Sequence, residues 1–401
     1  MHKTLVVLIL ATLIVAPQRS EERSKEQQIV ATWIKGVRAH KPGTIDPPLR
    51  EIADQPPRTF DLVCRTLNSA LSAIKEVQQR NDIRRRGALL HTDIAMLLPE
   101  RAADFTQKDL TLPAAVDLHW QKIPARREPD SVVLSADGEY VSSATETAHW
   151  WMASYLLRGI QPHAGEDPFV AAWSRAIAAH FESHYLFGSA ELHLNRTFAV
   201  LPDDPVLLFY AGTVHESYAS ARIQSVPSTS PTSARELNVL PAEEEWRRAE
   251  KYFRDSVKLG GPQEARLRLA RVKGQLGNHT EAAATLRDVV PALTGPRLQY
   301  LGHLFLGTEE GALEHIDQAR QSFERAARMQ PSAQSPLLGL AEMYRRTGNV
   351  SAAQETLRRL AALPDDSRLR EDSYLDYFRS LAFDAQAQLV AVRASVRDSG
   401  R

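Results

Sequence analysis

From about residue 169 onward, apolar side chains recur at intervals of three and four positions, and almost no stretch alternates polar and apolar residues. Spacing of three and four places apolar residues on one face of an α-helix, whereas strict alternation is typical of a half-buried β-strand. The pattern therefore predicts helix after helix joined by short turns, with close to no sheet. The expected fold class is all-α.

A shorter motif repeats within this region: a small residue, a bulky apolar residue four positions later, and a small or apolar residue three after that. The matches are Ala190/Leu194/Thr197, Ala249/Phe253/Ser256, Ala282/Leu286/Val289, Ala319/Phe323/Ala326 and Ala353/Leu357/Leu360. Their leading alanines are separated by 59, 33, 37 and 34 positions (249−190, 282−249, 319−282, 353−319). A recurrence near this length is typical of an array of helix hairpins.

A preceding helix completes each unit. In three units a small residue stands 12 positions before the leading alanine (190−178, 282−270, 353−341). Glycines fall at the expected turn between the two helices and prolines fall just after the second helix, where each residue type is favoured. These positions are Gly277, Gly348, Pro202, Pro331 and Pro364.

The region from about 169 to 365 resembles the tetratricopeptide-repeat family, most clearly in SPLLGLAEMYRRTGNVSAAQETLRRLAALP. The resemblance implies a right-handed α-solenoid of helix hairpins, each burying its neighbour's apolar face, because one hairpin alone cannot enclose a core. The chain departs from the family at Thr197 and Ser256, where alanine is usual, and at Lys273, where an aromatic residue is usual.

In such arrays the first helix of each pair lines a concave groove that binds proteins or peptides. The resemblance places in this groove Arg175, Ala179, Glu182, Phe209, Thr213, Glu216, Arg268, Arg271, Tyr300, His303, Glu342, Arg345 and Arg346. Because the planar guanidinium binds carboxylates with two parallel hydrogen bonds, the arginines favour an acidic or C-terminal peptide segment as partner. The alternative is that they pair with neighbouring glutamates on the helices.

Three further regions surround or interrupt the array. Residues 21–168 show helical patterns at 25–39, 58–81, 84–97 and 140–157 and a possible hairpin at 131–142, without a clean repeat. They are either degenerate repeats or a separate domain. Residues 220–241, rich in Pro, Ser and Thr, predict a mobile insertion. Residues 366–401 predict a capping helix, over 373–395, and a tail.

Residues 1–20 pair a basic start with a run of twelve apolar positions, Leu5 to Ala16. This run is too short to span a membrane comfortably, so it favours a secretory signal peptide, with an uncleaved N-terminal anchor as the alternative. Arginine is much more frequent than lysine and alanine is abundant, which indicates a bacterial coding bias. The expected location is therefore periplasmic or secreted, with membrane attachment only through an uncleaved N-terminal segment.

Composition narrows the classes of function. With 43% hydrophobic and 24% charged residues, the chain is neither wholly disordered nor a multi-span membrane protein. Lys+Arg and Asp+Glu are equal at 49 each, which gives no electrostatic reason to expect nucleic acid. Cys64 is the only cysteine, so no internal disulfide can form, and its apolar surroundings predict a buried thiol.

Candidate chemistry is sparse. The phosphate-loop, dinucleotide-binding, hydrolase and zinc-protease motifs are absent from the sequence, so we expect no cofactor, no metal and no catalytic residues. Weaker alternatives are a metal pair at His180 and His184, and a sugar-stacking face at Trp150 and Trp151, of which at least one is expected in the core. The run Arg84 to Arg86 is expected to be a solvated edge.

The sequence thus predicts a non-catalytic scaffold or adaptor that binds protein or peptide in the bacterial cell envelope. The alternative is a helical enzyme or a carbohydrate-binding module, with its site in the N-terminal region or beneath residues 220–241.

Overall fold

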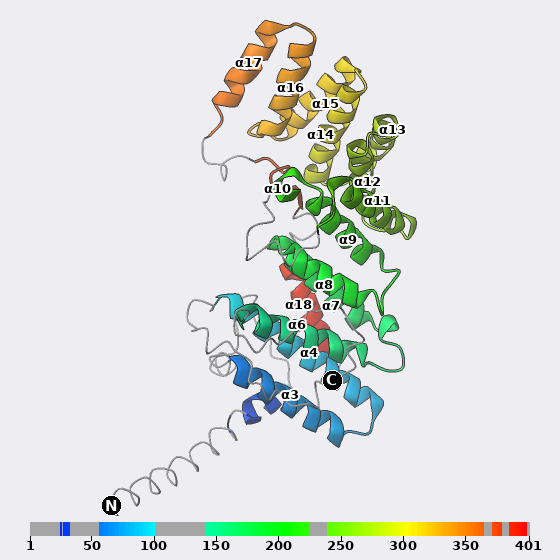
Figure 1. Ribbon diagram of the computed structural model, residues 1–401, viewed down its shortest axis with the longest axis vertical. Helices are drawn as coiled ribbons and strands as arrows, with labels where there is room; N and C mark the ends of the chain where they lie inside the picture. The colour runs from blue at the N-terminus through cyan, green and yellow to red at the C-terminus, as the bar shows by residue number, and fades with distance from the viewer. Residues whose placement is uncertain are drawn as a thin grey trace, which may run out of the picture. The chain divides into compact units, whose positions relative to one another are not determined.

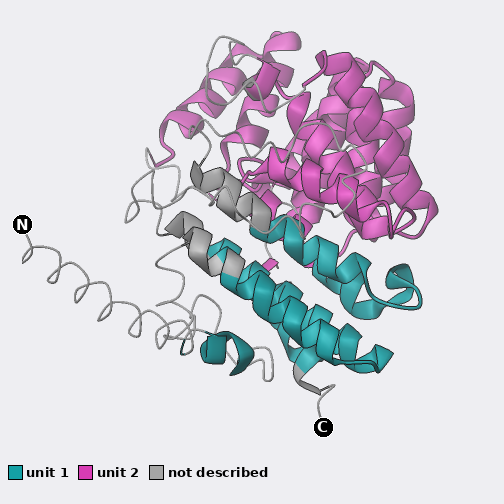
Figure 2. Cartoon of the chain, turned by 60° about the horizontal axis from the view of Figure 1, so that its bottom comes forward, with its two compact units in different colours: residues 1–173, 387–401 teal, residues 174–386 magenta. Residues whose placement is uncertain are grey.

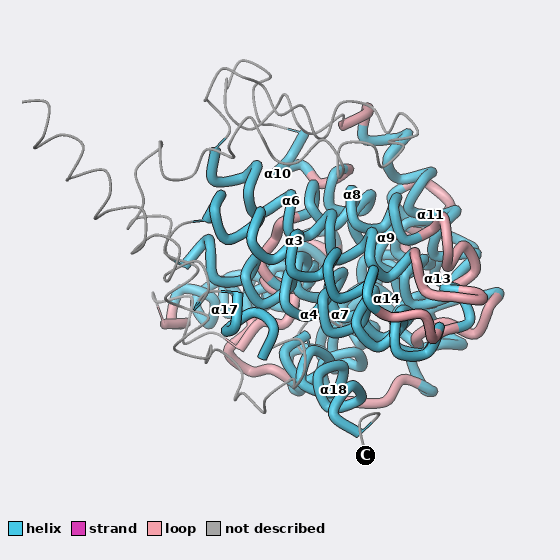
Figure 3. The backbone as a smooth tube through the Cα atoms, turned by 90° about the horizontal axis from the view of Figure 1, so that it is seen from below, coloured by secondary structure: helices cyan, strands magenta, loops and turns pink. Residues whose placement is uncertain are grey.

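A computed structural model describes residues 25, 27–32, 56–100, 141–224, 239–364, 371–378 and 385–398. Every regular element in these residues is a helix (Figure 3), so the all-α fold class is confirmed. The signal-like residues 1–20, most of the hairpin expected at 131–142 and residues 225–238 of the insertion lie outside the described part. No helix within the described ranges is both long and apolar enough to cross a membrane.

The chain divides into two compact units (Figure 2). One comprises residues 1–173 and 387–401, and the other residues 174–386. The first contains α3 (Pro56–Ala73), α4 (Val77–Glu100), α6 (Val141–Arg158), the short η2 (Ala164–Glu166), the beginning of α7 (Pro168–Ser183) and most of α18 (Ala385–Asp398). The second contains the remaining helices.

Two helices replace the single helix expected over 58–81. Residues 74–76 interrupt it, and the Glu76 carboxylate accepts hydrogen bonds from the backbone amides of Gln78 and Gln79, at 3.1 and 2.9 Å. A carboxylate in this position caps the free N–H groups of a new helix and is favoured by the helix dipole. The side chain of Glu76 therefore accounts for the start of α4.

The core of the first unit is built from apolar side chains of α3, α4 and α6 together with Trp173. The indole of Trp173 donates a hydrogen bond to the Thr92 hydroxyl at 2.9 Å. Cys64 is buried, as its apolar surroundings predicted. Ion pairs join Arg85 to Asp167 and Arg393 to Asp93.

The second unit is a row of helix hairpins (Figure 1). The pairs are α7 with α8 (Phe187–Thr197), α9 (Pro205–Tyr218) with α11 (Ala242–Lys258), α12 (Gln263–Gln275) with α13 (His279–Val289), α14 (Pro296–Ala312) with α15 (Ile316–Met329), and α16 (Gln334–Arg346) with α17 (Val350–Ala361). The short helices α10 (Ala221–Gln224) and η3 (Val290–Ala292) follow α9 and α13.

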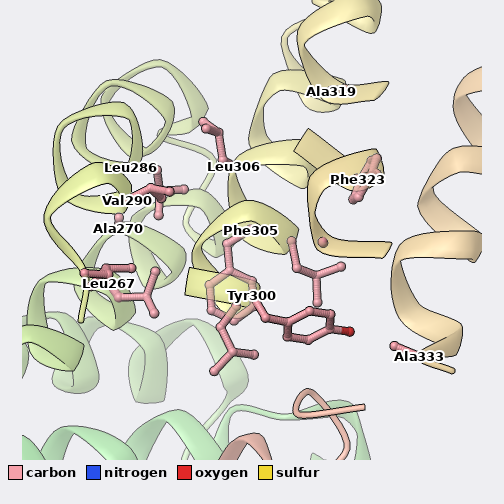
Figure 4. Packing of buried hydrophobic residues seen from close by; sticks show 14 of the residues in the cluster. Leu267, Ala270, Leu286, Val290, Tyr300, Phe305, Leu306, Ala319, Phe323 and Ala333 are labelled. Carbon is pink, nitrogen blue, oxygen red and sulfur yellow. The ribbon is translucent and has the colours of Figure 1, made fainter. Parts of the chain in front are cut away.

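Small residues let neighbouring helices approach closely. A Cβ atom added at Gly212 of α9 would lie 2.5 Å from the ring of Phe253 of α11. Added at Gly307 of α14 or Gly339 of α16, it would lie 2.8 or 2.6 Å from the ring of Phe323 of α15. The bulky repeat positions Phe253 and Phe323 thus pack against glycines of the neighbouring first helices. Figure 4 shows Phe323 within the apolar cluster that these helices share.

The hairpin turns use a left-handed residue. Gly277 and Gly348 have φ of +86° and +71°, a region that glycine enters without steric cost, which explains the two turn glycines of the repeat. Tyr185 and Glu314, with φ of +58° and +62°, take the equivalent place before α8 and α15. These turns therefore lack the glycine that marks the others in the sequence.

The end of the array differs from the sequence prediction. A single helix over 373–395 does not form, because residues 371–378 make turns and α18 begins only at Ala385. The last hairpin keeps apolar side chains in solvent: Val350 and Leu357 of α17 are 62% and 49% exposed. Residues 371–378 do not cover this face but pack against first helices of earlier hairpins and the start of α16.

Candidate functional site

Residues 371–378, with the sequence EDSYLDYF, lie against the first helices of three successive hairpins and the start of a fourth. We call them the resident segment. Their hydrogen-bond partners include Glu216 of α9, Arg268 of α12, Tyr300 of α14 and Ser335 of α16. Three of these four residues are among those that the repeat register placed in a binding groove.

Tyr377 is the deepest residue of the resident segment, with 1% of its surface exposed. The Cζ atoms of Arg268 and Arg271 lie 4.0 and 4.7 Å from its ring centroid, within the range of cation–π attraction. Its hydroxyl donates to Glu216 Oε1 at 2.7 Å. Burial raises the pKa of Tyr377 well above its ordinary value, so the phenol remains a hydrogen-bond donor.

The backbone of the resident segment is bound as well as its side chains. Arg268 donates from Nη2 to the carbonyl oxygen of Tyr377 at 2.6 Å. Arg297 of α14 donates to the carbonyls of Asp376 and Tyr377 at 3.3 and 3.5 Å. Carbonyl contacts of this kind are available to any peptide with the same backbone course, whatever its side chains.

Asp372 anchors the other end of the resident segment. Its carboxylate accepts hydrogen bonds from the Tyr300 hydroxyl at 2.7 Å and from the backbone amide and hydroxyl of Ser335 at 3.0 and 2.7 Å. Next to it, Gln330 donates to the Ser373 hydroxyl at 2.7 Å and accepts from the Ser373 amide at 3.0 Å. The site therefore recognises a carboxylate without using a positive charge.

The buried Arg268 and the partly buried Arg271 are paired inside the array. Arg268 contacts Glu216 Oε2 at 2.6 Å and Glu264 Oε1 at 3.0 Å, and Arg271 contacts Glu216 Oε1 at 2.6 Å. Burial by itself lowers the pKa of Arg268, but Tyr377, Glu264 and Glu216 raise it above the ordinary value, so the charge is retained. Here the structure shows the pairing with neighbouring glutamates that was the alternative interpretation, and not arginine forks on the carboxylates of the resident segment.

Glu182 of α7 is fully buried beside this network, and neither of its carboxylate oxygens has a hydrogen-bond partner among the described residues. Burial raises the pKa of Glu182 well above its ordinary value, Arg268 opposes the rise, and Glu264 and Glu216 add to it. The neutral acid is therefore favoured at this position.

The other residues placed in the groove by the repeat register lie elsewhere or beneath the site. Phe209, Thr213 and Ala179 are buried in the helix packing. Four others make their described polar contacts away from the resident segment: Arg175 binds Asp204, Arg345 and Glu342 bind each other, and Arg346 binds the Gly311 carbonyl. His303 is half-buried, and its Nδ1 has no hydrogen bond among the described residues. The structure thus brings together Glu182, Glu216, Arg268, Arg271 and Tyr300, with the ring of Phe209 beneath them, 5.6 Å from the Arg268 Cζ atom.

Sequence reasoning missed the residues that complete the site: Glu264, Arg297, Ser335, Asp372 and Tyr377. In the resident segment Tyr374, Tyr377 and Phe378 are spaced three and four apart. This is the spacing of a helix face, and it hid the turns that the segment forms.

The weaker chemical candidates are placed as follows. The rings of His180 and His184 lie 4.6 Å apart, but no group of three or more metal-ligating side chains is found within the described ranges. Trp150 is buried, as expected for at least one of the tryptophan pair, whereas Trp151 stacks on Tyr155. The arginine run is not the solvated edge that was expected, because Arg84, Arg85 and Arg86 are all partly buried. Arg85 and Arg86 pair with Asp167 and Asp82, and Arg84 donates a hydrogen bond to Asn81.

Taken together, the helices define an all-α solenoid of hairpins with a peptide segment bound on its first helices. The tetratricopeptide-repeat family model matches residues 240–295 and 306–367, covering α11 to α17. Residues 240–295 and 306–367 are therefore tetratricopeptide repeats.

Solved structures of similar fold include MamA from Desulfovibrio magneticus RS-1, 18% identical, with a TM-score of 0.38 over 49% of this chain and 97% of that one. PilF of Pseudomonas aeruginosa is 13% identical, with a TM-score of 0.38 over 57% and 93%. YrrB, described as having an unusual peptide-binding site, is 15% identical, with a TM-score of 0.35 over 48% and 85%. No curated protein matches the sequence.

Proposed function

We propose that the protein is a non-catalytic adaptor that binds a protein or peptide segment on the face formed by α9, α12 and α14. One observation carries the proposal. This face already holds eight residues of peptide through a carboxylate, a tyrosine ring and backbone carbonyls, all bound by side chains of the first helices. Such a mixture of backbone and side-chain contacts is how proteins bind peptides.

An acidic segment is the partner that this chemistry favours. The resident segment contains Glu371, Asp372 and Asp376, and the Asp372 carboxylate receives three hydrogen bonds from the array. The neighbouring Arg268 and Arg271 are held by the buried Glu216, and Tyr377 and Glu216 raise the pKa of both above the ordinary value, so their positive charge attracts a negatively charged chain.

We further propose that the adaptor works in the bacterial cell envelope, as a periplasmic or secreted protein. The support is the basic start and twelve-residue apolar run of residues 1–20, which is typical of an export signal.

Peptide selection tests the function. A random display library is selected on the purified full chain, and a selected peptide is then titrated into the Arg271→Gln and Arg345→Gln variants. We expect acidic peptides, an affinity reduced at least about tenfold by Arg271→Gln because a buried charge contact is lost, and no change with Arg345→Gln. Failure to select any peptide, or equal effects of the two variants, would overturn the proposal.

A further inference from the structure

The position of the resident segment in the chain suggests what the partner looks like. The hydroxyl of Tyr377 reaches Glu216, 161 residues earlier, and the Arg268 contact spans 109 residues. The segment belongs to neither flanking helix, since α17 ends at Ala361 and α18 begins at Ala385. It contacts the array as a bound peptide does.

We propose that the resident segment occupies the partner site, and that the partner is another protein presenting the same pattern, an acidic residue followed five positions later by tyrosine. This inference rests on the proposed function and specifies its ligand. The partner and the resident segment would compete for one set of contacts.

The contacts define which side chains of the peptide the array recognises. Asp372 is bound by Tyr300 and Ser335, and Tyr377 by Glu216, Arg268 and Arg271. Between them, Leu375 is 47% exposed and has no polar contact through its side chain. The array therefore fixes the first and last positions of the pattern and leaves a position between them free to vary.

Neighbouring contacts support a bound turn and not an extended strand. Within the segment, the amide of Tyr374 donates to the Asp372 carboxylate at 3.1 Å, and the amide of Tyr377 donates to the Tyr374 carbonyl at 3.2 Å. An aspartate that accepts from the amide two residues on stabilises such a turn. A partner with an acidic residue at the first position can form the same turn, which brings its tyrosine to Glu216.

Competition lowers the affinity that a partner shows for the intact chain. Its apparent dissociation constant is the intrinsic value divided by the fraction of molecules in which the resident segment has left the site. A resident segment bound 90–99% of the time would lower the partner's apparent affinity about ten- to a hundredfold. Loosening the resident segment should therefore strengthen partner binding without any change to the site itself.

A synthetic peptide of residues 371–378 provides the probe. It is titrated into the full chain and into full chains carrying Tyr377→Ala, Asp372→Ala or Leu375→Ala. We expect at least about tenfold tighter binding to the Tyr377→Ala and Asp372→Ala chains than to the unchanged chain. The Leu375→Ala chain should behave like the unchanged chain, and a peptide with alanine in place of its tyrosine should not bind any of them.

Two substitutions are used because the loss of the large buried ring of Tyr377 can unfold the array, whereas Asp372, although also buried, is a smaller side chain at the other end of the segment. Cooperative thermal unfolding identifies the variants that remain folded. Equal affinity for the unchanged chain and for a folded variant would overturn the inference. So would dimers of the variant, detected by light scattering, since the occupant would then be a second copy of the chain.

The outcome separates this inference from the proposed function. If a library-selected peptide binds the full chain but the 371–378 peptide does not displace it, the resident segment is not a competitor and the adaptor function stands. If neither peptide binds any folded variant, both proposals fail.

Discussion

The guanidinium of Arg268 lies over the ring of Tyr377 at 4.0 Å and also donates a hydrogen bond to the carbonyl of the same residue. One buried cation thus binds the aromatic ring and the backbone of a segment 109 residues away. The same cation forms ion pairs with Glu216 and Glu264. It connects the resident segment to the charged interior of the array.

Replacing Arg268 should destabilise the array strongly. Arg268→Met keeps much of the side-chain volume but leaves the carboxylates of Glu216 and Glu264 buried without their main counter-charge. Breaking a buried ion pair in this way costs about 3–5 kcal/mol. Urea unfolding measures the loss, and Arg345→Met, which removes an exposed arginine of the same array, should leave the midpoint unchanged. A similar midpoint for both variants would show that the buried network contributes little.

Glu182→Gln should stabilise the protein in a pH-dependent manner. The pKa of Glu182 is raised in the folded chain. The stability that the protonated Glu182 contributes to the folded state is therefore complete at pH values below the unfolded pKa, about 4.3. That contribution is lost as pH rises through the folded pKa. The glutamine variant stays neutral, so its advantage in unfolding free energy should be near zero at low pH. Above that it should grow by up to about 1.4 kcal/mol per pH unit.

Unfolding of the unchanged chain and of Glu182→Gln, followed across a pH series, checks this prediction. Glu342→Gln serves as the control, because Glu342 is on the surface beside Arg345 and its pKa is lowered. A difference between the unchanged chain and Glu182→Gln that does not vary with pH would contradict the assignment of a neutral Glu182.

Gly212→Ala should overpack the second hairpin. The added methyl group would lie 2.5 Å from the ring of Phe253, which is fully buried. Overpacking of this kind costs about 1–3 kcal/mol. The companion change Phe253→Leu should recover part of the loss in the double variant. Gly311→Ala is the matched control, since the nearest atom to its methyl group would be the flexible end of Met343 at 3.3 Å, with Ala319 in ordinary contact at 3.8 Å.

Asp204 is both the N-cap of α9 and the partner of Arg175, and two substitutions separate these roles. Its carboxylate accepts from the amides of Val206 and Leu207 at 3.0 and 3.1 Å, while Arg175 approaches to 2.6 Å. Asp204→Ala should cost about 1–2 kcal/mol, mainly from the lost cap. Arg175→Met keeps the cap and should cost less in the same thermal unfolding assay. Equal costs would assign the effect to the ion pair.

The sequence predicted most of the array because its repeating features are local. Gly348 marks a turn by its left-handed backbone, and Ala319 with Phe323 marks a buried helix face, and each depends only on residues within a hairpin or its neighbour. Glu216, Arg268 and Arg271, which the repeat register assigned to one groove, contact one another in the structure. Their pairing with one another was an open alternative, since it depends on distances between helices.

The resident segment could not be predicted in the same way. Tyr374, Tyr377 and Phe378 have the spacing of an amphipathic helix, and the groups that bind them lie on helices more than seventy residues earlier. Local propensity favours one structure and long-range contacts select another. The interruption before α4 is a smaller case, in which the Glu76 carboxylate stabilises a helix start that hydrophobic spacing does not reveal.

The long sequence separation between Tyr377 and Glu216 also orders the events of folding. Hairpins close by contacts between near neighbours, which form quickly, whereas joining positions so far apart must first overcome a large loss of chain entropy. During synthesis α9, α12 and α14 leave the ribosome before Tyr377 exists. These helices can therefore pack before Tyr377 reaches them, and under the proposed function a partner present at that stage would meet no competing segment.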